Sequence, residues 1–596
     1  MTHDSWNSLP AMFFDRALRL GTKPFLWWKR EGHYRPITWA AAACDIRRVA
    51  CGLRSLGISP GDRVGLVGEN RPEWVIADLA IMSAGAITVP GYVTQTVEAQ
   101  RHLLENSGAC AVIVSKAPSS ATVLAAAMLV ESVHTVIEIE PTAAWAGSVD
   151  VRSWEEVLAR GSYDAGDISQ CIGAIEPEDT ACLIYTSGAG GVPKGVITSH
   201  RNILANCRGL HKVLETLGLD DAVFLSFLPL SHSYEHTAGL MFPISLGAQI
   251  FFAEGAEALA ANMLEARPTV VTAVPRFYEI LHRRIHLEAE RQGAVAKLLL
   301  DQAVRIGRKR SVSQSIGLGE RLIDTLLDRL VRSKLHRRFG GRLKAMISAG
   351  APLNPEIGSF FLALGIGLLQ GYGQTEAGPG ISCNSPARIK IDTVGPPLDG
   401  VRVRIAEDGE IWVAGENVMS GYWNDPEATE QVLDDGWLKT GDIGFLDRDG
   451  FIRITDRKRD IIKTSGGEMV SPARIEGYLT TEPEICQAMV FGDRRPYLVA
   501  ILVPDPDFVA GFTLQNNDAP PIAGDPRFSK AIGTAVARVN QLLSPPERVR
   551  RFLIADEPFT TANGLMTPTL KIRRNAIRES YCAALDALYE RAHAAD

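Results

Sequence analysis

The stretch that decides the fold is Tyr185–Val196, which reads Tyr-Thr-Ser-Gly-Ala-Gly-Gly-Val-Pro-Lys-Gly-Val and follows the apolar run Ala181–Ile184. A buried strand that ends in hydroxyl groups, glycines and a lysine is typical of a phosphate-binding loop. Glycines let backbone N–H groups converge on an anion, Thr186 and Ser187 add hydroxyl donors, and Lys194 adds positive charge. The sequence therefore predicts a phosphate site at the end of a strand.

The spacing of this loop excludes a Walker-type nucleotide site. Counted from Gly188, that motif needs glycine before the lysine and serine or threonine after it. Here Pro193 and Gly195 occupy those places. We therefore expect a phosphate loop of another kind, with Gly188 among its contacts.

Length and composition limit the class of protein. A chain of 596 residues exceeds a single hydrophobic core, so two or more domains are expected. The net charge of -7 gives no overall attraction to nucleic acid. The nine cysteines include no Cys-x-x-Cys pair, which favours a reducing cytosol over a zinc site or a disulfide framework. The longest apolar runs are about half of the ~20 residues that span a bilayer, and the N-terminus lacks the pattern of a secretory signal. We expect a cytoplasmic protein.

The region from about residue 36 to 300 alternates short β-rich runs with helical patterns. This rhythm is typical of a parallel α/β architecture. The pattern predicts a helix over Trp74–Ser83 and strands over Val64–Val67, Ala86–Pro90, Ala111–Val114, Thr135–Ile139 and Gln249–Ala253.

Residues 294–338 differ, because they are long, helical in pattern and rich in arginine and lysine. Their apolar side chains share one helical face with most basic residues off it. One interpretation is a helical pair packed on the main body, which is the commoner arrangement. The other is peripheral contact with a membrane surface. The apolar face consists of Leu322, Ile323, Leu326, Leu327, Leu330, Val331 and Leu335.

Past residue 390 the sequence changes to short strands and turns. Asp449-Gly450 between two β-rich runs predicts a hairpin. The charged run Asp456–Asp460 is the best candidate for a domain boundary, and Ser471-Pro472 predicts a helix start. We therefore expect an N-terminal domain over 1–455, a hinge over 456–460 and a C-terminal domain over 461–596.

Further segments resemble, in the same order, those of the AMP-forming adenylating superfamily of acyl-CoA synthetases, luciferase and adenylation domains. The resemblance spans most of the chain. It implies an α/β fold with a large N-terminal domain of two α/β subdomains and a small β-barrel-like part, followed by a small mobile α+β domain. The matching segments are Ser348–Leu353, Gln370–Glu376, Asp435–Asp442, Asp456–Asp460 and Asn563–Lys571.

The resemblance implies a set of ATP contacts. Tyr372 would stack on adenine and Thr375 would contact the α-phosphate. Asp442 would accept hydrogen bonds from both ribose hydroxyls, because an ionised acceptor suits a vicinal diol. Arg459 falls at the hinge, where the family usually carries Asp or Lys. The remaining implied contacts are Thr186, Ser187, Gly188, Lys194, Gly350, Ala351, Pro352, Gln370, Gly371, Gly373 and Arg457.

The catalytic residues implied by the resemblance are Lys571, Glu376, His232 and Thr186. Glu376, with Thr186, would hold Mg²⁺, because a hard carboxylate oxygen next to triphosphate suits this ion. Lys571 would be the lysine of adenylate formation. Coenzyme A would enter a channel lined by Lys463, Gly466 and Gly467 after the C-terminal domain rotates.

The substrate implied is a long-chain fatty acid. The segment Leu228–His236, the element Val274–Tyr278, the 294–338 region and the Pro-Thr-Leu-Lys ending at Lys571 all resemble the long-chain branch. The expected reaction is ATP-dependent formation of acyl-AMP and transfer to CoA, which yields acyl-CoA, AMP and pyrophosphate. Fatty acid and CoA are the expected partners, with no nucleic acid. The chain is expected to be a monomer or homodimer, cytoplasmic or peripheral at the inner membrane face.

Three alternatives stay open. The acyl group could pass to a carrier protein, although the segment Lys463–Gly467 favours CoA. The acid could be another carboxylic acid. A binding protein without catalysis is suggested only by Ala189 and Gly190, where the family usually carries hydroxyl residues, and Glu376 with Lys571 argues against it. Loss of two hydroxyl donors, each contributing about 1 kcal/mol, predicts a raised Michaelis constant for ATP.

Overall fold

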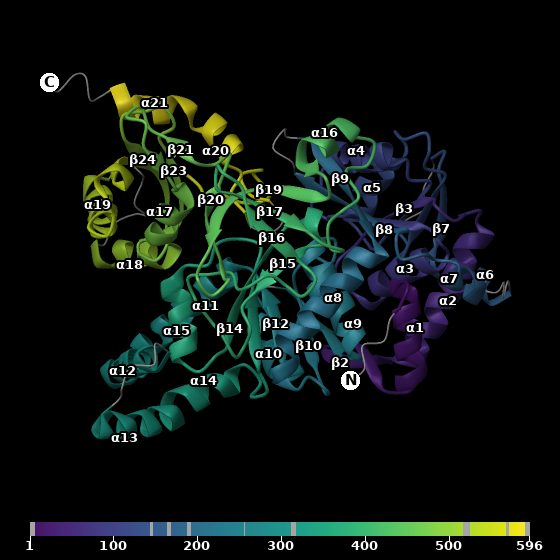
Figure 1. Cartoon of the computed structure of the whole chain (residues 1–596), viewed down its shortest axis with the longest axis horizontal. Helices are drawn as coiled ribbons and strands as arrows, with labels where there is room; N and C mark the ends of the chain where they lie inside the picture. The colour runs from purple at the N-terminus through teal and green to yellow at the C-terminus, as the bar shows by residue number, and fades with distance from the viewer. Residues whose placement is uncertain are drawn as a thin grey trace.

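The computed structural model describes residues 6–142, 147–163, 168–187, 192–255, 257–311, 317–516, 525–567 and 571–590. Two α/β units and a small β-sheet unit form the larger N-terminal part, and a smaller α+β unit follows (Figure 1). The expected fold class is confirmed.

The first α/β unit is built on a seven-stranded sheet in the order β7-β6-β5-β3-β4-β8-β9, parallel except for the β8–β9 pair. Its predicted strands and helix are present to within two residues. The strands are β3 (Arg63–Val67), β4 (Ile87–Gly91), β5 (Ala111–Val114), β6 (Thr135–Glu138), β7 (Asp150–Ser153), β8 (Thr180–Ser187) and β9 (Pro193–Ser199). The helices are α1 (Leu9–Leu20), α2 (Trp39–Ser55), α3 (Pro72–Ser83), α4 (Val97–Ser107), α5 (Ser119–Ala127), α6 (Trp154–Tyr163) and α7 (Ile168–Gly173).

The second α/β unit is built on an eight-stranded sheet in the order β15-β14-β13-β12-β10-β11-β1-β2. Only the two edge pairs are antiparallel. The strands are β1 (Pro24–Arg30), β2 (His33–Thr38), β10 (Val223–Ser226), β11 (Gln249–Phe252), β12 (Val270–Ala273), β13 (Ala345–Ser348), β14 (Leu368–Gly373) and β15 (Gly380–Cys383). The accompanying helices are α8 (His200–Leu214), η1 (Glu215–Leu217), η2 (Glu235–Met241), α9 (Phe242–Leu246), α10 (Leu259–Ala266), α11 (Pro275–Arg291) and α15 (Pro355–Ala363).

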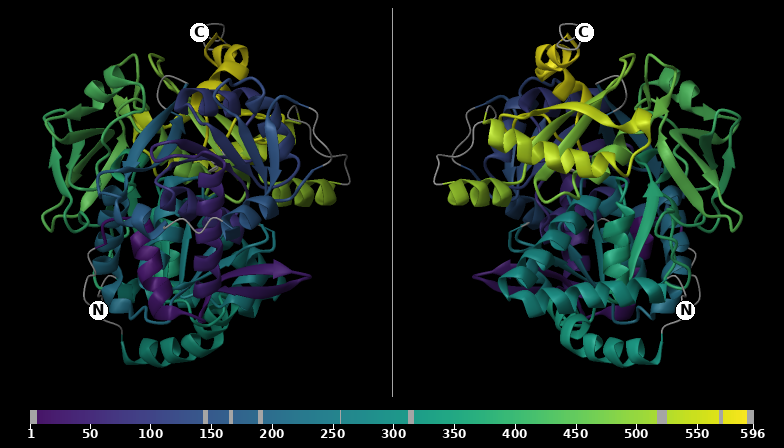
Figure 2. Two further views of the ribbon diagram at one scale, coloured as in Figure 1. Left: turned by 90° about the vertical axis from the view of Figure 1, so that its right-hand side faces the viewer. Right: turned by 90° about the vertical axis from the view of Figure 1, so that its left-hand side faces the viewer.

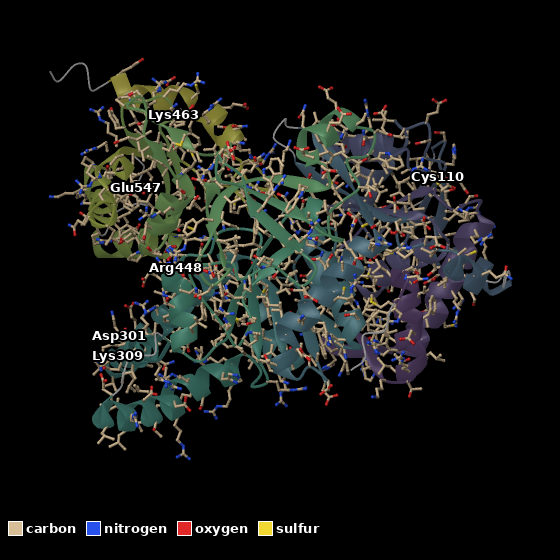
Figure 3. All side chains as sticks on the ribbon, viewed as in Figure 1. Cys110, Asp301, Lys309, Arg448, Lys463 and Glu547 are labelled. Carbon is tan, nitrogen blue, oxygen red and sulfur yellow. The ribbon has the colours of Figure 1, made fainter. Side chains whose placement is uncertain are left out.

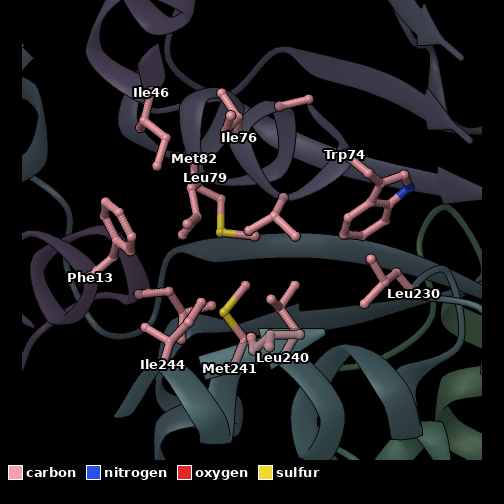
Figure 4. Packing of buried hydrophobic residues seen from close by; sticks show 14 of the residues in the cluster. Phe13, Ile46, Trp74, Ile76, Leu79, Met82, Leu230, Leu240, Met241 and Ile244 are labelled. Atoms are coloured by element: carbon pink, nitrogen blue, oxygen red, sulfur yellow. The ribbon is translucent and has the colours of Figure 1, made fainter. Parts of the chain in front are cut away.

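Helix α3 joins the two units by packing against η2 and α9. Figure 4 shows Ile76, Leu79 and Met82 facing Leu240 and Met241 across this junction. All of these side chains are buried, so hydrophobic contact holds the two sheets in one rigid block. The segments at the ends of β8 and β14, where the sequence predicts site residues, depend on that block for their relative position.

The small unit is a five-stranded antiparallel sheet, and its Asp449-Gly450 hairpin is confirmed between β19 and β20. After this unit, at the start of the C-terminal unit, Ser471 caps the helix Pro472–Leu479 as predicted and accepts a hydrogen bond from the backbone N–H of Arg474. The elements of the small unit are β16 (Arg402–Ile405), β17 (Glu410–Ala414), α16 (Pro426–Val432), β18 (Leu433–Asp434), β19 (Trp437–Leu446) and β20 (Ile452–Arg457), with the turn η4 (Thr375–Ala377) leading into β15.

The C-terminal unit packs a three-stranded sheet, β23-β24-β25, against helices on its own core. It docks on α11, where Arg283 pairs with Asp505 and Arg276 donates to the Cys486 thiol at 3.0 Å. Its elements are β21 (Ile462–Lys463), β22 (Met469–Val470), α17 (Pro472–Leu479), β23 (Ile485–Phe491), β24 (Leu498–Pro504), α18 (Pro506–Asn516), α19 (Pro526–Asn540), η5 (Pro545–Glu547), β25 (Val549–Ile554), α20 (Arg574–Ser580) and α21 (Cys582–Glu590).

A helical arm over residues 294–338 extends from the second α/β unit (Figure 1). The expected packing of its apolar face on the main body is wrong in part. Leu327 and Leu335 are buried, whereas Leu322, Leu326 and Leu330 are exposed. The arm comprises α12 (Ala294–Ser311), α13 (Leu318–Leu327), η3 (Asp328–Arg332) and α14 (Ser333–Arg338).

Candidate active site

The predicted phosphate loop connects two paired strands. Thr186 pairs with Lys194 and Ser187 with Pro193, so β8 and β9 form the two sides of a hairpin. Gly188, Ala189 and Gly190 lie outside the described residues. Thr186 and Lys194 therefore lie opposite each other where the two strands end, which suits a phosphate site, whereas the side chain of Ser187 lies outside the described residues.

Lys194 is held by the small unit. Its ammonium lies 3.3 Å from the Asp425 carboxylate and 5.3 Å from the centre of the Tyr422 ring. Backbone bonds explain this, because Ile197 donates to the Gly421 carbonyl at 3.0 Å and lays that segment along β9. A cation that is half-exposed and weakly paired remains available to an anionic ligand.

The turn expected on the adenine side follows β13, with Gly350 at a φ of 88°. A side chain would be strained at this angle, which accounts for the glycine. Ala351 and Pro352 continue the turn towards α15. The small residues leave the backbone accessible to a flat base.

Tyr372, Asp442 and Arg457 form the best-connected part of the site. The Tyr372 hydroxyl donates to Asp442 Oδ2 at 2.6 Å, and Arg457 Nε lies 3.0 Å from Asp442 Oδ1. Burial raises the pKa of Tyr372, and the Asp442 carboxylate raises it further, so the hydroxyl stays a donor. β14 supplies the tyrosine, and the paired strands β19 and β20 supply the other two. The orientation of the buried carboxylate is thereby fixed by two contacts.

The rest of the Gln370–Gly373 segment supports this arrangement. Gln370 is buried and its amide donates to the Ile391 carbonyl. At Gly373 a Cβ would meet the Pro379 carbonyl oxygen at 1.8 Å, so only glycine fits. Gly371 has ordinary room, its nearest neighbour being 3.6 Å away.

Thr375 and Glu376 follow directly in the turn η4. The Thr375 hydroxyl is 2.8 Å from the Ser233 hydroxyl, and Glu376 Oε1 accepts a hydrogen bond from the Tyr422 hydroxyl at 2.9 Å. No group of three metal-ligating side chains occurs in the part of the chain that the structure describes. A single carboxylate oriented by a tyrosine nevertheless fits Mg²⁺, which is usually held by one or two carboxylates together with substrate phosphates.

Lys571 reaches this cluster from the C-terminal unit. Burial lowers its pKa to about 8, and the charges of Arg457 and Arg459 act in the same direction. The carboxylates of Asp442 and Glu376 oppose that shift. The backbone N–H of the lysine donates to the Thr567 hydroxyl at 3.0 Å. A lysine 114 residues beyond Arg457 is thus brought among the charges of Asp442, Glu376 and Arg457.

His232 lies within the electrostatic reach of Lys571. Burial lowers the pKa of the imidazole to about 3, and the lysine charge lowers it further, so the ring is neutral. Its Nδ1 accepts a hydrogen bond from the Tyr234 backbone N–H at 3.2 Å. The ring hydrogen is therefore on Nε2, where the imidazole is a donor.

The residues expected to line the CoA channel are not in this cluster. Lys463 is exposed on the C-terminal unit, where its backbone N–H donates to Asp493 at 3.2 Å (Figure 3). Gly466 and Gly467 form the turn of the same β21–β22 hairpin, with Gly467 at a φ of 84°. The structure thus brings Lys571, but not the segment expected to line the channel, to the cluster of Asp442, Glu376 and Arg457.

Three site residues escaped prediction. They are Tyr422, whose hydroxyl donates to Glu376, Ser233, whose hydroxyl contacts that of Thr375, and Asp425, which pairs with Lys194. Tyr422 and Glu376 are 46 residues apart, and no local pattern links them. Ser233 sits beside His232 in a quoted segment, so its proximity to a site residue was the available signal.

Comparison with known proteins identifies the family. The model of the AMP-binding enzyme matches residues 13–423, and that of the AMP-binding enzyme C-terminal domain matches residues 459–593. The chain belongs to the AMP-binding enzyme family. The expected membership of this superfamily is confirmed, and together with the curated ligases to which the chain is similar it shows an enzyme of the ligase type.

Among curated proteins, the chain is similar to long-chain-fatty-acid–CoA ligases. The chain is 34% identical to the long-chain-fatty-acid–CoA ligase FadD15 of Mycobacterium tuberculosis, over 94% of this chain and 93% of the relative. It is 32% identical to long-chain-fatty-acid–CoA ligase 5 of Mus musculus, over 88% and 80%.

Solved structures of the same fold include the adenylation domain of a carboxylate reductase from Mycobacterium chelonae, with a TM-score of 0.79, 22% identity and coverage of 99% and 92%. A benzoate CoA ligase from Burkholderia xenovorans has a TM-score of 0.71, 22% identity and coverage of 96% and 99%. At this level of identity the likeness concerns the fold alone.

Proposed function

We propose that this member of the AMP-binding family activates a long-chain fatty acid with ATP and transfers the acyl group to CoA. The observation that carries the proposal is Lys571 of the C-terminal unit among the charges of Asp442, Glu376 and Arg457. The names of the curated relatives support the acid and the thiol. The site residues given roles below are part of the proposal.

The first half-reaction joins two anions, so the site must neutralise charge. A carboxylate oxygen of the fatty acid attacks the α-phosphorus of ATP, the P–O bond to pyrophosphate breaks, and acyl-AMP forms. Lys571 and Thr375 contact the phosphate oxygens where charge develops, and Asp442 holds the ribose. Neutral His232 donates from Nε2 to the acid without adding a charge beside the lysine. One preorganised contact of this kind typically lowers the barrier by about 3 kcal/mol.

Glu376 is the residue that would hold Mg²⁺ with the ATP phosphates, together with Thr186. The ion would supply further positive charge to the triphosphate. Tyr422 orients the carboxylate by donating to Oε1, which leaves Oε2 for the ligand role.

The second half-reaction requires a different arrangement. The CoA thiolate attacks the acyl carbon and AMP leaves, with the carbon–oxygen bond to phosphate breaking as the thioester forms. Lys463 and the glycines Gly466 and Gly467 would line the channel for the narrow pantetheine arm. Because they lie on the surface of the C-terminal unit here, this unit, hinged at 456–460, must rotate between the two steps.

The deciding experiment measures AMP release from ATP with a series of fatty acids, with and without CoA. We expect CoA-dependent turnover that is greatest with long chains. Adenylate formation that ignores CoA would favour an acyl-AMP ligase that loads a carrier protein. AMP release that is greatest with an aryl or short acid would favour a synthetase for another carboxylic acid. No AMP release with any acid would favour a binding protein.

The location and partners belong to the same proposal. All nine cysteines are free thiols, which supports a reducing, cytoplasmic compartment. In the described residues no helix has the length and hydropathy of a membrane span. A fatty acid partitions into bilayers, so peripheral contact of the 294–338 region with the inner membrane face would place the enzyme beside its substrate. The oligomeric state, monomer or homodimer, stays a prediction.

A further inference from the structure

Helix α13 turns its acidic residues toward the arm and its leucines toward the solvent, whereas an ordinary surface helix packs its apolar face inward. Its acidic residues face inward, where Glu320 pairs with Lys309 at 2.7 Å and Asp324 pairs with Arg310 at 2.9 Å on α12. Arg332 of η3 adds a second bond to Asp324 at 2.7 Å. Ion pairs, rather than leucine packing, therefore attach most of this helix to the arm.

The outward face of α13 is a row of leucines at a spacing of four. Leu318 is 81% exposed, Leu322 77% and Leu326 55%, and the row continues into η3 at Leu330. Ile323 adds a fifth exposed apolar side chain. Single exposed leucines are normal on a protein surface, but a contiguous row on one helix marks an interaction site.

Charge distinguishes the partner. Residues 294–338 contain eleven lysines and arginines against four acidic residues, a net charge of +7 in a chain whose total is -7. The four acidic residues include Glu320 and Asp324, which are already paired inside the arm. Arg321 and Arg329 are exposed on the same helical segment as the leucine row. An apolar row among cations complements an anionic bilayer surface, whereas two such arms would repel each other.

The position of α13 allows such contact. The arm runs along the margin of the molecule in Figure 1 and in both side views of Figure 2, on the side away from the seven-stranded sheet. We infer that the outer face of α13 docks the enzyme on an anionic lipid surface, with the leucine row entering the headgroup region and the arginines contacting lipid phosphates. This rests on the proposed function in that a lipid-dissolved acid is the substrate.

The test measures co-sedimentation of the full-length protein with vesicles, in the absence of ATP, CoA and fatty acid. One set of vesicles contains phosphatidylglycerol and the other only phosphatidylcholine. We expect binding to the anionic vesicles that weakens with salt. Leu322→Ser with Leu326→Ser should reduce the partition coefficient about tenfold or more. The matched control is Leu18→Ser with Leu542→Ser, two exposed leucines elsewhere, which should not change it.

Three results overturn the inference. They are no binding of the unaltered protein to anionic vesicles, equal loss in the control pair, or a dimer that the Leu322/Leu326 variant converts to monomer in light scattering. The last result would assign the face to a second copy of the chain.

AMP release with a medium-chain acid in solution, measured on the same variants, should stay unchanged. Failure of that activity in every variant would count against the proposed function and leave the vesicle result standing.

Discussion

The ammonium of Lys571 titrates close to physiological pH because burial and two arginines disfavour its charge. Its ordinary pKa is 10.5, and in the folded protein it is about 8. The cation is therefore present below pH 8 and is lost as the pH rises through that value. We predict that kcat/KM for ATP in adenylate formation falls about tenfold per pH unit above pH 8. Pyrophosphate release between pH 6 and about 10 measures this.

Substitution of the lysine separates this effect from other groups. Lys571→Ala should slow adenylate formation about 100- to 1000-fold and remove the fall above pH 8. Thioester formation from supplied acyl-AMP should change little, because in the proposed mechanism the lysine has left the site before that step. A profile that keeps its alkaline limb in the alanine variant would assign the titration to another residue.

Glu235 lies in the buried core, and its pKa is raised, whereas the pKa of Lys571 is lowered. It is fully buried, accepts hydrogen bonds from Ser226 and Thr272, and burial raises its pKa from 4.5 to about 7. A raised folded pKa means that the unfolded chain loses its proton first as the pH rises. Stability should therefore decrease between about pH 4.5 and 7, by about 3 kcal/mol.

The variant Glu235→Gln should remove this slope, because an amide keeps the shape and both hydroxyls can turn to meet it. Denaturant unfolding of both proteins across that pH range measures the effect. Parallel curves for the two proteins would show that the carboxyl is not the source.

At the scale of elements, β14 contains two glycines that differ sharply in the room around them. A Cβ at Gly373 would meet a backbone oxygen at 1.8 Å, whereas at Gly371 the nearest atom is at 3.6 Å. We predict that Gly373→Ala costs about 3 kcal/mol or more, because the β14–β15 hairpin cannot move apart without losing its pairing. Gly371→Ala is the matched control and should lower the melting temperature little. Thermal unfolding of both variants checks the contrast.

The predictability of elements from sequence follows from how local their causes are. The strand over Ala111–Val114 and the helix N-cap at Ser471 each depend on residues close by in the sequence, and both are confirmed. Packing of the apolar face of α13 on the main body was one of two interpretations of the sequence, and it is wrong for most of the helix, because Glu320 and Asp324 pair with residues on α12 and the leucines lie on the outer face. Hydrophobic periodicity finds the apolar face of a helix but not what that face meets.

The same reasoning applies to the site. The motif segments locate Asp442, Glu376 and Lys571, because their neighbours in sequence carry the signal. Tyr422 contacts Glu376 only through the pairing of its segment with β9, a long-range event that no local pattern encodes. Ala189 and Gly190, where the family usually carries hydroxyl residues, lie outside the described residues, so kinetic measurements must test their effect on ATP binding. Ala189→Thr with Gly190→Thr should lower the Michaelis constant for ATP, and an unchanged constant would contradict the reasoning.

At the scale of the whole molecule, the proposed rotation makes the contact between the C-terminal unit and the second α/β unit decisive, and we predict that this contact sets the balance between the two half-reactions. Arg283 pairs with the buried Asp505 and donates to the Ile485 carbonyl, and Asn354 donates to the Gly477 carbonyl at 2.9 Å. Rotation of the C-terminal unit breaks these bonds. Arg283→Ala should therefore lower the share of molecules with Lys571 in the site.

This shift has opposite consequences for the two steps. A quarter of the Arg283 side chain is exposed, so the pair is weaker than a fully buried one, and its loss should shift the equilibrium about tenfold. We predict slower pyrophosphate release from ATP and equal or faster thioester formation from supplied acyl-AMP. Arg284→Ala, at the exposed neighbouring position, is the control and should leave both rates unchanged. Because Asp505 also caps α18, its own substitution would confound folding with rotation, and the arginine is the cleaner side of the pair to remove. Equal losses in both half-reactions would mean that the pair merely holds the fold, and that some other contact sets the balance between the two arrangements.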